Sequence, residues 1–286
     1  MIPAAFDYRR ATSLDDALGA LAGGEAKVIA GGMSLLPLMK LRLASPERLV
    51  DIGRLNELRG VRQLPDGRLA IGALTTYSEL ADSPAREYGL IRDALPDIGD
   101  VQVRNRGTVG GSVAHCDPAS DLPAVLLALG ADIVARSKRG EKVYPVDGFF
   151  TGAFTTALAD DELVTEIRLM GPRDDAGSAF VSLSQRASGY SIVGVAAVVI
   201  KEGGSAITRA GIALTGVGEA PYRAKAAEAA LLGNEGTAES IAEAAAHAID
   251  GVTVAGDIHA DSEYRAAMAV IYTRRAIEAA LVRLHE

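Results

Sequence analysis

The 286-residue sequence has one cysteine, no tryptophan, few other aromatic residues and no excess of positive charge. A single cysteine, Cys116, excludes a disulfide within the chain and an iron–sulfur cluster held by this chain alone. The formal net charge of −8 argues against nucleic acid as a partner, because nucleic-acid recognition normally requires a basic surface. The scarcity of aromatic residues argues equally against a surface that stacks bases.

Long hydrophobic runs are also missing. The longest apolar runs, such as residues 192–200, are far shorter than the roughly 20 residues that cross a bilayer. Residues 1–10 lack the charged and apolar regions of a signal peptide. We therefore expect a cytoplasmic protein, with association at the inner face of a membrane as an alternative.

The common catalytic and nucleotide-binding fingerprints are absent from the sequence. No glycine precedes a lysine, so there is no P-loop, and no Gly-x-Ser-x-Gly motif marks a nucleophilic serine. Gly216 and Gly218 open a GxGxxG pattern, but Pro221 occupies the position of its last glycine. The four histidines lack the spacing of a helical metal site. We expect no metal site in this chain.

Two short glycine-rich turns stand out instead: residues 30–34 (AGGMS) and residues 108–112 (TVGGS). Adjacent glycines let the backbone approach a ligand closely and adopt positive φ. Successive free N–H groups in such a turn form a concave anion site. Two such turns in one chain predict a pyrophosphate held from both sides, and hence a large nucleotide cofactor.

The segments around these turns indicate an N-terminal part made of short helices and strands. Ser13, Ser34 and Asp121 each precede or open a helical stretch and are predicted as helix caps. The pattern predicts helices over 14–21, 35–43 and 121–129, a strand over 27–30, hairpins within 61–73 and 133–144, and a strand over 163–170. The first turn therefore lies between a strand and a helix start, where backbone geometry and helix dipole both favour an anion.

The sequence after the polar segment 171–175, the predicted domain boundary, begins with strands and ends with helices. Strands are predicted over 191–200 and 207–215, and alanine-rich helices over 224–232, 238–249 and 263–284. The apolar face predicted for the last helix consists of Ala267, Met268, Ile271, Ile277, Leu281 and Leu284. Strands followed by helices indicate an α+β fold.

Four residues near the second turn carry reactive or charged groups. His115 and Cys116 are adjacent, which disfavours a catalytic pair, so we interpret Cys116 as structural rather than as a thiolate nucleophile. Asp117 and Asp121 are suited to hydrogen bonds with the ribose hydroxyls of a ligand. Asp121 has the alternative role of a helix cap, and both roles can coexist.

The residues around the turns carry a specific resemblance. Segments 28–42 (VIAGGMSLLPLMKLR), 102–123 (QVRNRGTVGGSVAHCDPASDLP) and 186–196 (RASGYSIVGVA) resemble, in order, the FAD-binding medium subunit of the molybdenum hydroxylases. This is the xanthine dehydrogenase family, and the resemblance is closest to the aerobic carbon monoxide dehydrogenase type. It extends over nearly the whole chain.

The resemblance implies a domain organisation. Residues 1–175 would form an FAD-binding domain of the PCMH or vanillyl-alcohol-oxidase type, with lobes at about 1–56 and 57–175. Residues 176–286 would form a smaller α+β domain like the C-terminal domain of the carbon monoxide dehydrogenase flavoprotein. The two lobes would hold the cofactor between them.

The resemblance also implies roles for individual residues. Both glycine loops would contact the FAD pyrophosphate and adjoining parts, Ile98 would pack on the cofactor, and Asp121 would bind its adenosine portion. Leu163 or Val164 would contact the flavin end through the backbone. Tyr190 would lie near the isoalloxazine, with a tyrosine at the edge of a core strand as the alternative. The predicted FAD-binding residues are Val28, Ile29, Ala30, Gly31, Gly32, Met33, Ser34, Leu35, Ile98, Thr108, Val109, Gly110, Gly111, Ser112, Asp117, Asp121, Leu163, Val164 and Tyr190.

Two positions depart from the family pattern. Met33 stands where relatives of the carbon monoxide enzyme often have histidine or glutamine, which leaves the substrate or the acceptor open but not FAD binding. Ser182 stands where the family has a lysine that contacts the cofactor, and Arg186 is the candidate to replace that charge.

The family's chemistry implies a division of labour between subunits. A large subunit with a molybdenum cofactor would oxidise the substrate, and a small subunit with two [2Fe–2S] clusters would pass the electrons to FAD in this chain. FAD would deliver them to a quinone or an NAD-type acceptor, so we expect no catalytic acid–base pair here. The complex would be a dimer of heterotrimers. Alternatives are a stand-alone FAD oxidase or reductase of the same fold, a medium subunit of an aldehyde, purine or N-heterocycle dehydrogenase, and a scaffold that has lost FAD.

Overall fold

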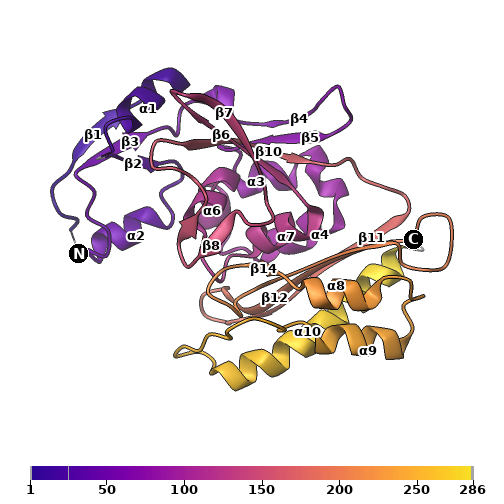
Figure 1. The fold of residues 1–286 in the computed structure, drawn as a ribbon. Helices are drawn as coiled ribbons and strands as arrows, with labels where there is room; N and C mark the ends of the chain where they lie inside the picture. The colour runs from indigo at the N-terminus through magenta and orange to yellow at the C-terminus, as the bar shows by residue number, and fades with distance from the viewer. Residues whose placement is uncertain (1, 25, 285–286) are drawn as a thin grey trace.

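The first 56 residues form a small lobe around a three-stranded parallel sheet, drawn in indigo and purple in Figure 1. The computed structural model describes residues 2–24 and 26–284. The strands lie in the order β1-β3-β2, and two short helices connect them. The elements are β1 (Asp7–Arg10), α1 (Leu14–Leu21), β2 (Ala26–Ile29), α2 (Leu35–Lys40) and β3 (Arg48–Asp51). Ser13 caps α1 as predicted, because its Oγ accepts a hydrogen bond from the Asp16 N–H at 3.1 Å.

A second lobe is built on a five-stranded antiparallel sheet in the order β4-β5-β10-β6-β7. Helices α3, α4, α6 and α7 bury one face of this sheet in the largest core cluster. The helical elements are η1 (Asn56–Leu58), α3 (Tyr77–Ala81), η2 (Pro84–Glu87), α4 (Gly89–Ala94), η3 (Leu95–Asp97), α5 (Val101–Arg104), α6 (Val109–His115) and α7 (Asp121–Leu129). The strands are β4 (Val61–Gln63), β5 (Leu69–Gly72), β6 (Asp132–Ser137), β7 (Gly140–Pro145) and β10 (Leu163–Leu169), and β8 (Phe150–Gly152) pairs separately with β9 (Thr155–Thr156).

The rest of the chain contains a four-stranded antiparallel sheet in the order β11-β12-β13-β14. One face packs on the last three helices, and the other packs on α7 through small residues such as Ala196 and Ala213. Figure 1 shows this arrangement, with the orange and yellow helices below the sheet. The elements are β11 (Ala176–Ser184), β12 (Ser191–Ile200), β13 (Arg209–Thr215), β14 (Tyr222–Arg223), α8 (Lys225–Leu231), α9 (Ala238–Ala246) and α10 (Ser262–Arg283).

The α+β prediction is confirmed, and so are both hairpins of the second lobe. The predicted cap at Asp121 is wrong, and the predicted cap at Ser34 is confirmed in position only. Ser34 precedes a helix that ends at Lys40 instead of residue 43, and its side chain makes no capping hydrogen bond. Ser120, not Asp121, is the residue before α7, and the Asp121 carboxylate bonds to another residue instead.

The buried face of α10 also differs from the prediction. The residues that are buried are Arg265, Ala269, Thr273, Ala276, Ile277 and Ala280, whereas Ala267 and Ile271 are exposed. The cause is close packing: a Cβ on Gly177 of β11 would lie only 1.9 Å from the Ala280 carbonyl oxygen. Small side chains face the sheet because the helix backbone lies almost directly on it. At 22 residues α10 is the longest helix within the described ranges, and none of these helices is long and apolar enough to span a bilayer.

Candidate functional site

A cavity of about 1010 Å³ lies where the two lobes and the edge of the C-terminal sheet meet. Both glycine turns line it, together with the start of β10, the β8–β9 hairpin and the loop before β12. The structure therefore brings together segments far apart in the sequence. Of the predicted FAD-binding residues, Val109 alone does not line the cavity, because its side chain is buried in the core of the second lobe.

The first glycine turn presents unused backbone donors to this cavity. The N–H groups of Gly31, Gly32, Met33 and Ser34 find no hydrogen-bond acceptor within residues 2–24 and 26–284. Gly32 has a φ of +76°, which disfavours any side chain there. Consecutive free N–H groups of this kind are the donors with which a backbone turn can bind a phosphate.

The first turn is in direct contact with the segment just before the second turn. A Cβ on Gly31 would lie 2.0 Å from the carbonyl oxygen of Arg106 and 3.2 Å from the Cα of Gly107. Only glycine fits between these backbones. The first turn is thus fixed against the segment that leads into the second.

The second turn differs from the expectation of free donors. It forms the start of α6, where Thr108 Oγ1 accepts from the Gly111 N–H at 3.2 Å. The N–H groups of Val109 and Gly110 donate to the carbonyls of Thr75 (3.0 Å) and Ala73 (2.8 Å). These glycines allow close helix packing rather than an anion cradle, so the free backbone donors are concentrated in the first turn.

Asp117 and Asp121 both line the cavity near α7. Asp121 is 5% exposed and accepts a hydrogen bond of 2.6 Å from Ser191 Oγ. Burial raises the pKa of its carboxyl to about 7, an effect that the Ser191 hydrogen bond partly offsets. Ser120 Oγ lies 2.9 Å from Ser112 Oγ, which ties this region to the second turn. The cavity thus has free backbone donors in the first glycine turn and carboxylate-bearing residues near α7.

Tyr190 and Ile98 form the part of the cavity nearest the C-terminal sheet. Tyr190 is 51% exposed, and burial of its hydroxyl end raises its pKa. Ser182 and Arg186 do not line the cavity: Ser182 Oγ lies 3.0 Å from Ser184 Oγ, and Arg186 is exposed to solvent. Arg186 is therefore not in place to supply the charge of the missing lysine.

Sequence reasoning missed the β8–β9 hairpin, which contributes Phe154, Thr155 and Thr156 to the cavity wall. Phe154 has a φ of +54°, and its ring centroid lies 5.1 Å from that of His115. No motif marks this hairpin, so its position follows only from the folded chain. Cys116 is buried beside it, donates to the Gly152 carbonyl at 3.3 Å, and has a pKa raised to about 11 by burial. The thiol is structural, as interpreted.

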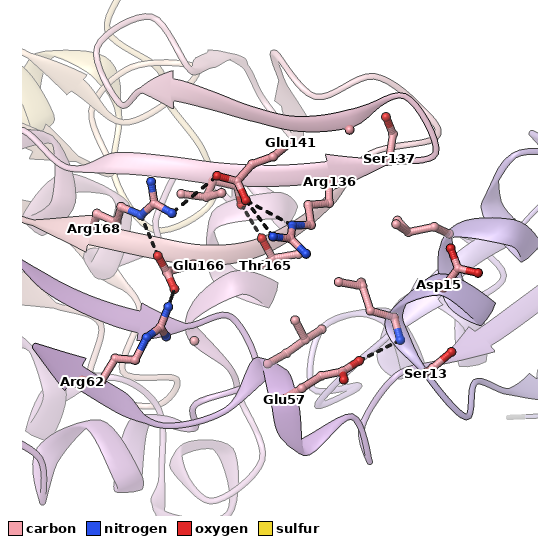
Figure 2. Close-up of a pocket in the computed structure, with 16 residues that line it drawn as sticks. Ser13, Asp15, Glu57, Arg62, Arg136, Ser137, Glu141, Thr165, Glu166 and Arg168 are labelled. Atoms are coloured by element: carbon pink, nitrogen blue, oxygen red, sulfur yellow. Dashed lines mark hydrogen bonds and ion pairs between the residues drawn. The ribbon is translucent and has the colours of Figure 1, made fainter. Parts of the chain in front are cut away.

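A second hollow, of about 680 Å³, lies on the outer face of the five-stranded sheet beside α1. Figure 2 shows that the charged side chains on the sheet face, from Arg62, Arg136, Glu141, Glu166 and Arg168, pair with one another. Glu166 pairs with Arg62 and with Arg168 (2.6 Å), and Glu141 pairs with Arg136 (2.9 Å) and Arg168 (3.5 Å). These pairings occupy the charged groups of the sheet face, and neither glycine turn lines this hollow. The larger cavity is therefore the candidate site.

Comparison with known proteins identifies the family. The sequence profile of the FAD binding domain in molybdopterin dehydrogenase matches residues 4–170, more than half of the chain. The chain belongs to this family. The profile of the CO dehydrogenase flavoprotein C-terminal domain matches residues 178–280.

Two relatives and a solved structure are similar over nearly their whole lengths. The carbon monoxide dehydrogenase medium chain of Hydrogenophaga pseudoflava is 39% identical over 99% of both chains. The 6-hydroxypseudooxynicotine dehydrogenase complex subunit alpha of Paenarthrobacter nicotinovorans is 37% identical over 99% of this chain and 97% of that protein. The structure of carbon monoxide dehydrogenase from Hydrogenophaga pseudoflava superposes with a TM-score of 0.95 at 40% identity, over 99% of both chains.

Family membership establishes the cofactor and the class of enzyme. The protein binds FAD and is an oxidoreductase subunit of the molybdenum-containing dehydrogenases, which act as complexes. The free N–H groups of residues 31–34 fit a cofactor that carries a pyrophosphate.

Proposed function

We propose that this chain is the electron-transfer flavoprotein subunit of a molybdenum hydroxylase and that FAD occupies the cavity between the two lobes. The single observation that carries the proposal is the row of four free N–H groups in the first glycine turn, which faces this cavity. A helix or loop with all its donors satisfied would offer a pyrophosphate nothing. FAD, when bound, supplies the redox chemistry by accepting electrons and delivering them to an acceptor.

The chain's own residues bind and orient the cofactor. The N–H groups of residues 31–34 donate to the pyrophosphate, while Asp117 and Asp121 accept hydrogen bonds from hydroxyl groups of the cofactor. Tyr190 and Ile98 cover the flavin end and exclude water from one side. Tyr190 is half exposed, which leaves an open approach for an electron acceptor at that end.

The electrons would come from [2Fe–2S] clusters of a small subunit, after oxidation of the substrate at a molybdenum cofactor in a large subunit. The acceptor would be a quinone or an NAD-type molecule, and the complex a dimer of heterotrimers. Two facts support a source of electrons outside this chain. It has a single, buried cysteine, and its described residues hold no group of three metal-ligating side chains.

Carbon monoxide is the first substrate to test, and aldehydes, purines and N-heterocycles are the alternatives. This chain does not choose between them, because relatives named for carbon monoxide and for a nicotine derivative are 39% and 37% identical to it. Met33, which differs from the residue that relatives often have there, lies in the first turn, and the backbone donors of this turn are free.

The test is purification of the chain from its native host under mild conditions. The proposal predicts a yellow complex that contains FAD, a large chain and a small cysteine-rich chain. A flavin that bleaches when the substrate is added anaerobically, and recovers its colour with a quinone or NAD, would support the complete electron path. A single yellow chain that turns over a substrate alone would favour the stand-alone oxidase or reductase, and a complex that releases no FAD on denaturation would favour the scaffold.

A further inference from the structure

The C-terminal sheet holds the segment that follows the second glycine turn. Thr215 Oγ1 lies 2.8 Å from the Pro118 carbonyl and 2.9 Å from the Ser120 carbonyl, and the Gly216 N–H donates to Pro118 at 2.7 Å. Ser191 Oγ donates to Asp121 at 2.6 Å. Residues 118–121, three of which line the cavity wall, are therefore fixed by the ends of β12 and β13.

The ends of these two strands are in turn joined by Arg265 of α10. Its Nη1 donates to the carbonyls of Ile192 (2.6 Å) and Gly216. Gly216 has a φ of +78°, and a Cβ there would lie 2.5 Å from the Ile192 carbonyl oxygen, so the two strand ends are in contact. One buried guanidinium thus bridges the start of β12 and the residue after β13.

The cost of burying Arg265 indicates that the guanidinium has a role beyond filling space. Its side chain is 6% exposed, and its only carboxylate partner within the described residues, Asp257, is 49% exposed. A buried charge is unfavourable unless hydrogen bonds compensate, and an apolar side chain would fill the same space without that cost. What an apolar side chain cannot do is donate to two carbonyls at once.

The hydrogen bonds form a continuous path from α10 to the cavity. Arg265 bonds to Gly216, the Gly216 N–H bonds to Pro118, and Ser120 Oγ lies 2.9 Å from Ser112 Oγ of the second turn. Each link joins groups that are buried or half-buried. Displacement of Gly216 would therefore move the cavity wall at residues 118–121.

We infer that Arg265 is a positioning residue for FAD, acting through Gly216 and Thr215 on the Pro118–Asp121 wall of the cavity. This inference rests on the proposed occupation of the cavity by FAD. Arg265 does not line the cavity, so its effect on the cofactor is indirect. It gives the C-terminal domain a part in the cofactor site.

The test compares FAD affinity in matched variants of the full chain, purified with the subunits that accompany it. FAD is removed, and rebinding is measured by flavin fluorescence, together with the visible spectrum of the bound flavin and the melting temperature. Arg265→Met removes the donors and keeps the length of the stem, and we expect the dissociation constant to rise at least about tenfold. Arg265→Lys keeps a charged donor and should restore part of the affinity.

Arg283→Met is the matched control. Arg283 lies near the other end of α10 and bonds to Asp93 and to the Ser178 carbonyl (2.9 Å), away from the cavity lining. This variant also removes a half-buried arginine that joins the two domains. We expect its FAD dissociation constant and flavin spectrum to stay within about twofold of the wild type.

Thr215→Val tests the same path if Arg265→Met does not fold. It removes the hydroxyl that bonds to Pro118 and Ser120 and keeps the shape of the side chain, and a rise of about fivefold is expected. Unchanged FAD affinity in both Thr215→Val and a folded Arg265→Met would overturn the inference about Arg265 and leave the proposed function standing. Equal loss of affinity and melting temperature in Arg265→Met and Arg283→Met would also overturn it, since the role would then be general stability. Failure of the wild type to rebind FAD would overturn the proposed function as well.

Discussion

Replacement of Gly31 by alanine is expected to push the first glycine turn away from residues 106–107 and to weaken FAD binding. A Cβ at this position would lie 2.0 Å from the Arg106 carbonyl oxygen, and real Cβ atoms essentially never approach another atom closer than 3.0 Å. One of the two backbones must therefore move by about 1 Å, the difference between these distances. The obstructing atom belongs to the backbone, so rotation of a side chain cannot relieve the contact.

The size of the effect follows from the donors that the turn presents. Residues 31–34 offer four N–H groups, and a hydrogen bond to a charged acceptor contributes about 1.5–3 kcal/mol. Loss of one such bond corresponds to an increase of about 10- to 150-fold in the dissociation constant. Overpacking should also destabilise the FAD-free chain by about 1–3 kcal/mol.

The assay is FAD rebinding by the deflavinated protein, with thermal unfolding measured in parallel. Gly23→Ala is the control, because a Cβ at Gly23 in the same lobe would meet no atom within 4 Å. We expect wild-type affinity from this control. Wild-type affinity in Gly31→Ala would show that the contact of Gly31 with residues 106–107 does not place the N–H groups of the first turn.

Three further predictions concern side chains. Burial raises the pKa of Asp121 from 3.8 to about 7, so the folded chain binds a proton that the unfolded chain releases, and the stability of the FAD-free chain falls as the pH rises from about 4 to about 7. Asp121→Asn should remove this part of the pH dependence, about 3 kcal/mol between pH 5 and pH 8, in thermal unfolding at these two pH values, and identical pH dependence in both proteins would contradict it. Ser13→Ala should lower the free energy of unfolding, measured in urea, by about 1 kcal/mol because Ser13 caps α1. Ser34→Ala removes no capping bond and should change this free energy by less than about 0.5 kcal/mol. Equal losses in the two variants would contradict this. Cys116 should react with a thiol reagent at pH 8 only after unfolding, because it is buried and its pKa is raised to about 11, and rapid reaction of the native protein would contradict this.

The location of the cofactor cavity could be predicted from the sequence because local features determine it. Adjacent glycines between a strand and a helix require a backbone turn with exposed donors, and the first turn forms one. The second turn could not be predicted in the same detail, since the acceptors for Val109 and Gly110 come from Ala73 and Thr75, more than thirty residues earlier. Whether an N–H group is free depends on which distant carbonyl the fold places beside it.

Polar residues were harder to predict than apolar ones. Asp121 is a residue type favoured as a helix cap and stands at the start of a predicted helix. Its carboxylate instead accepts a hydrogen bond from Ser191, which lies in a different domain of the predicted organisation. Arg265 was excluded from the predicted apolar face of α10, although its guanidinium is buried against two backbone carbonyls. In both cases a tertiary hydrogen bond determines the position, and the sequence contains no periodic signal for it.

The central claim is that FAD bound between the two lobes carries electrons from partner subunits to an acceptor. The most direct measurement is the visible absorbance of the flavin in the purified complex, followed anaerobically as carbon monoxide, an aldehyde, a purine or an N-heterocycle is added. The account predicts that one of these substrates bleaches the flavin, and that Gly31→Ala yields a complex with little flavin to bleach. A complex that oxidises its substrate and reduces the acceptor at the wild-type rate without flavin would contradict it.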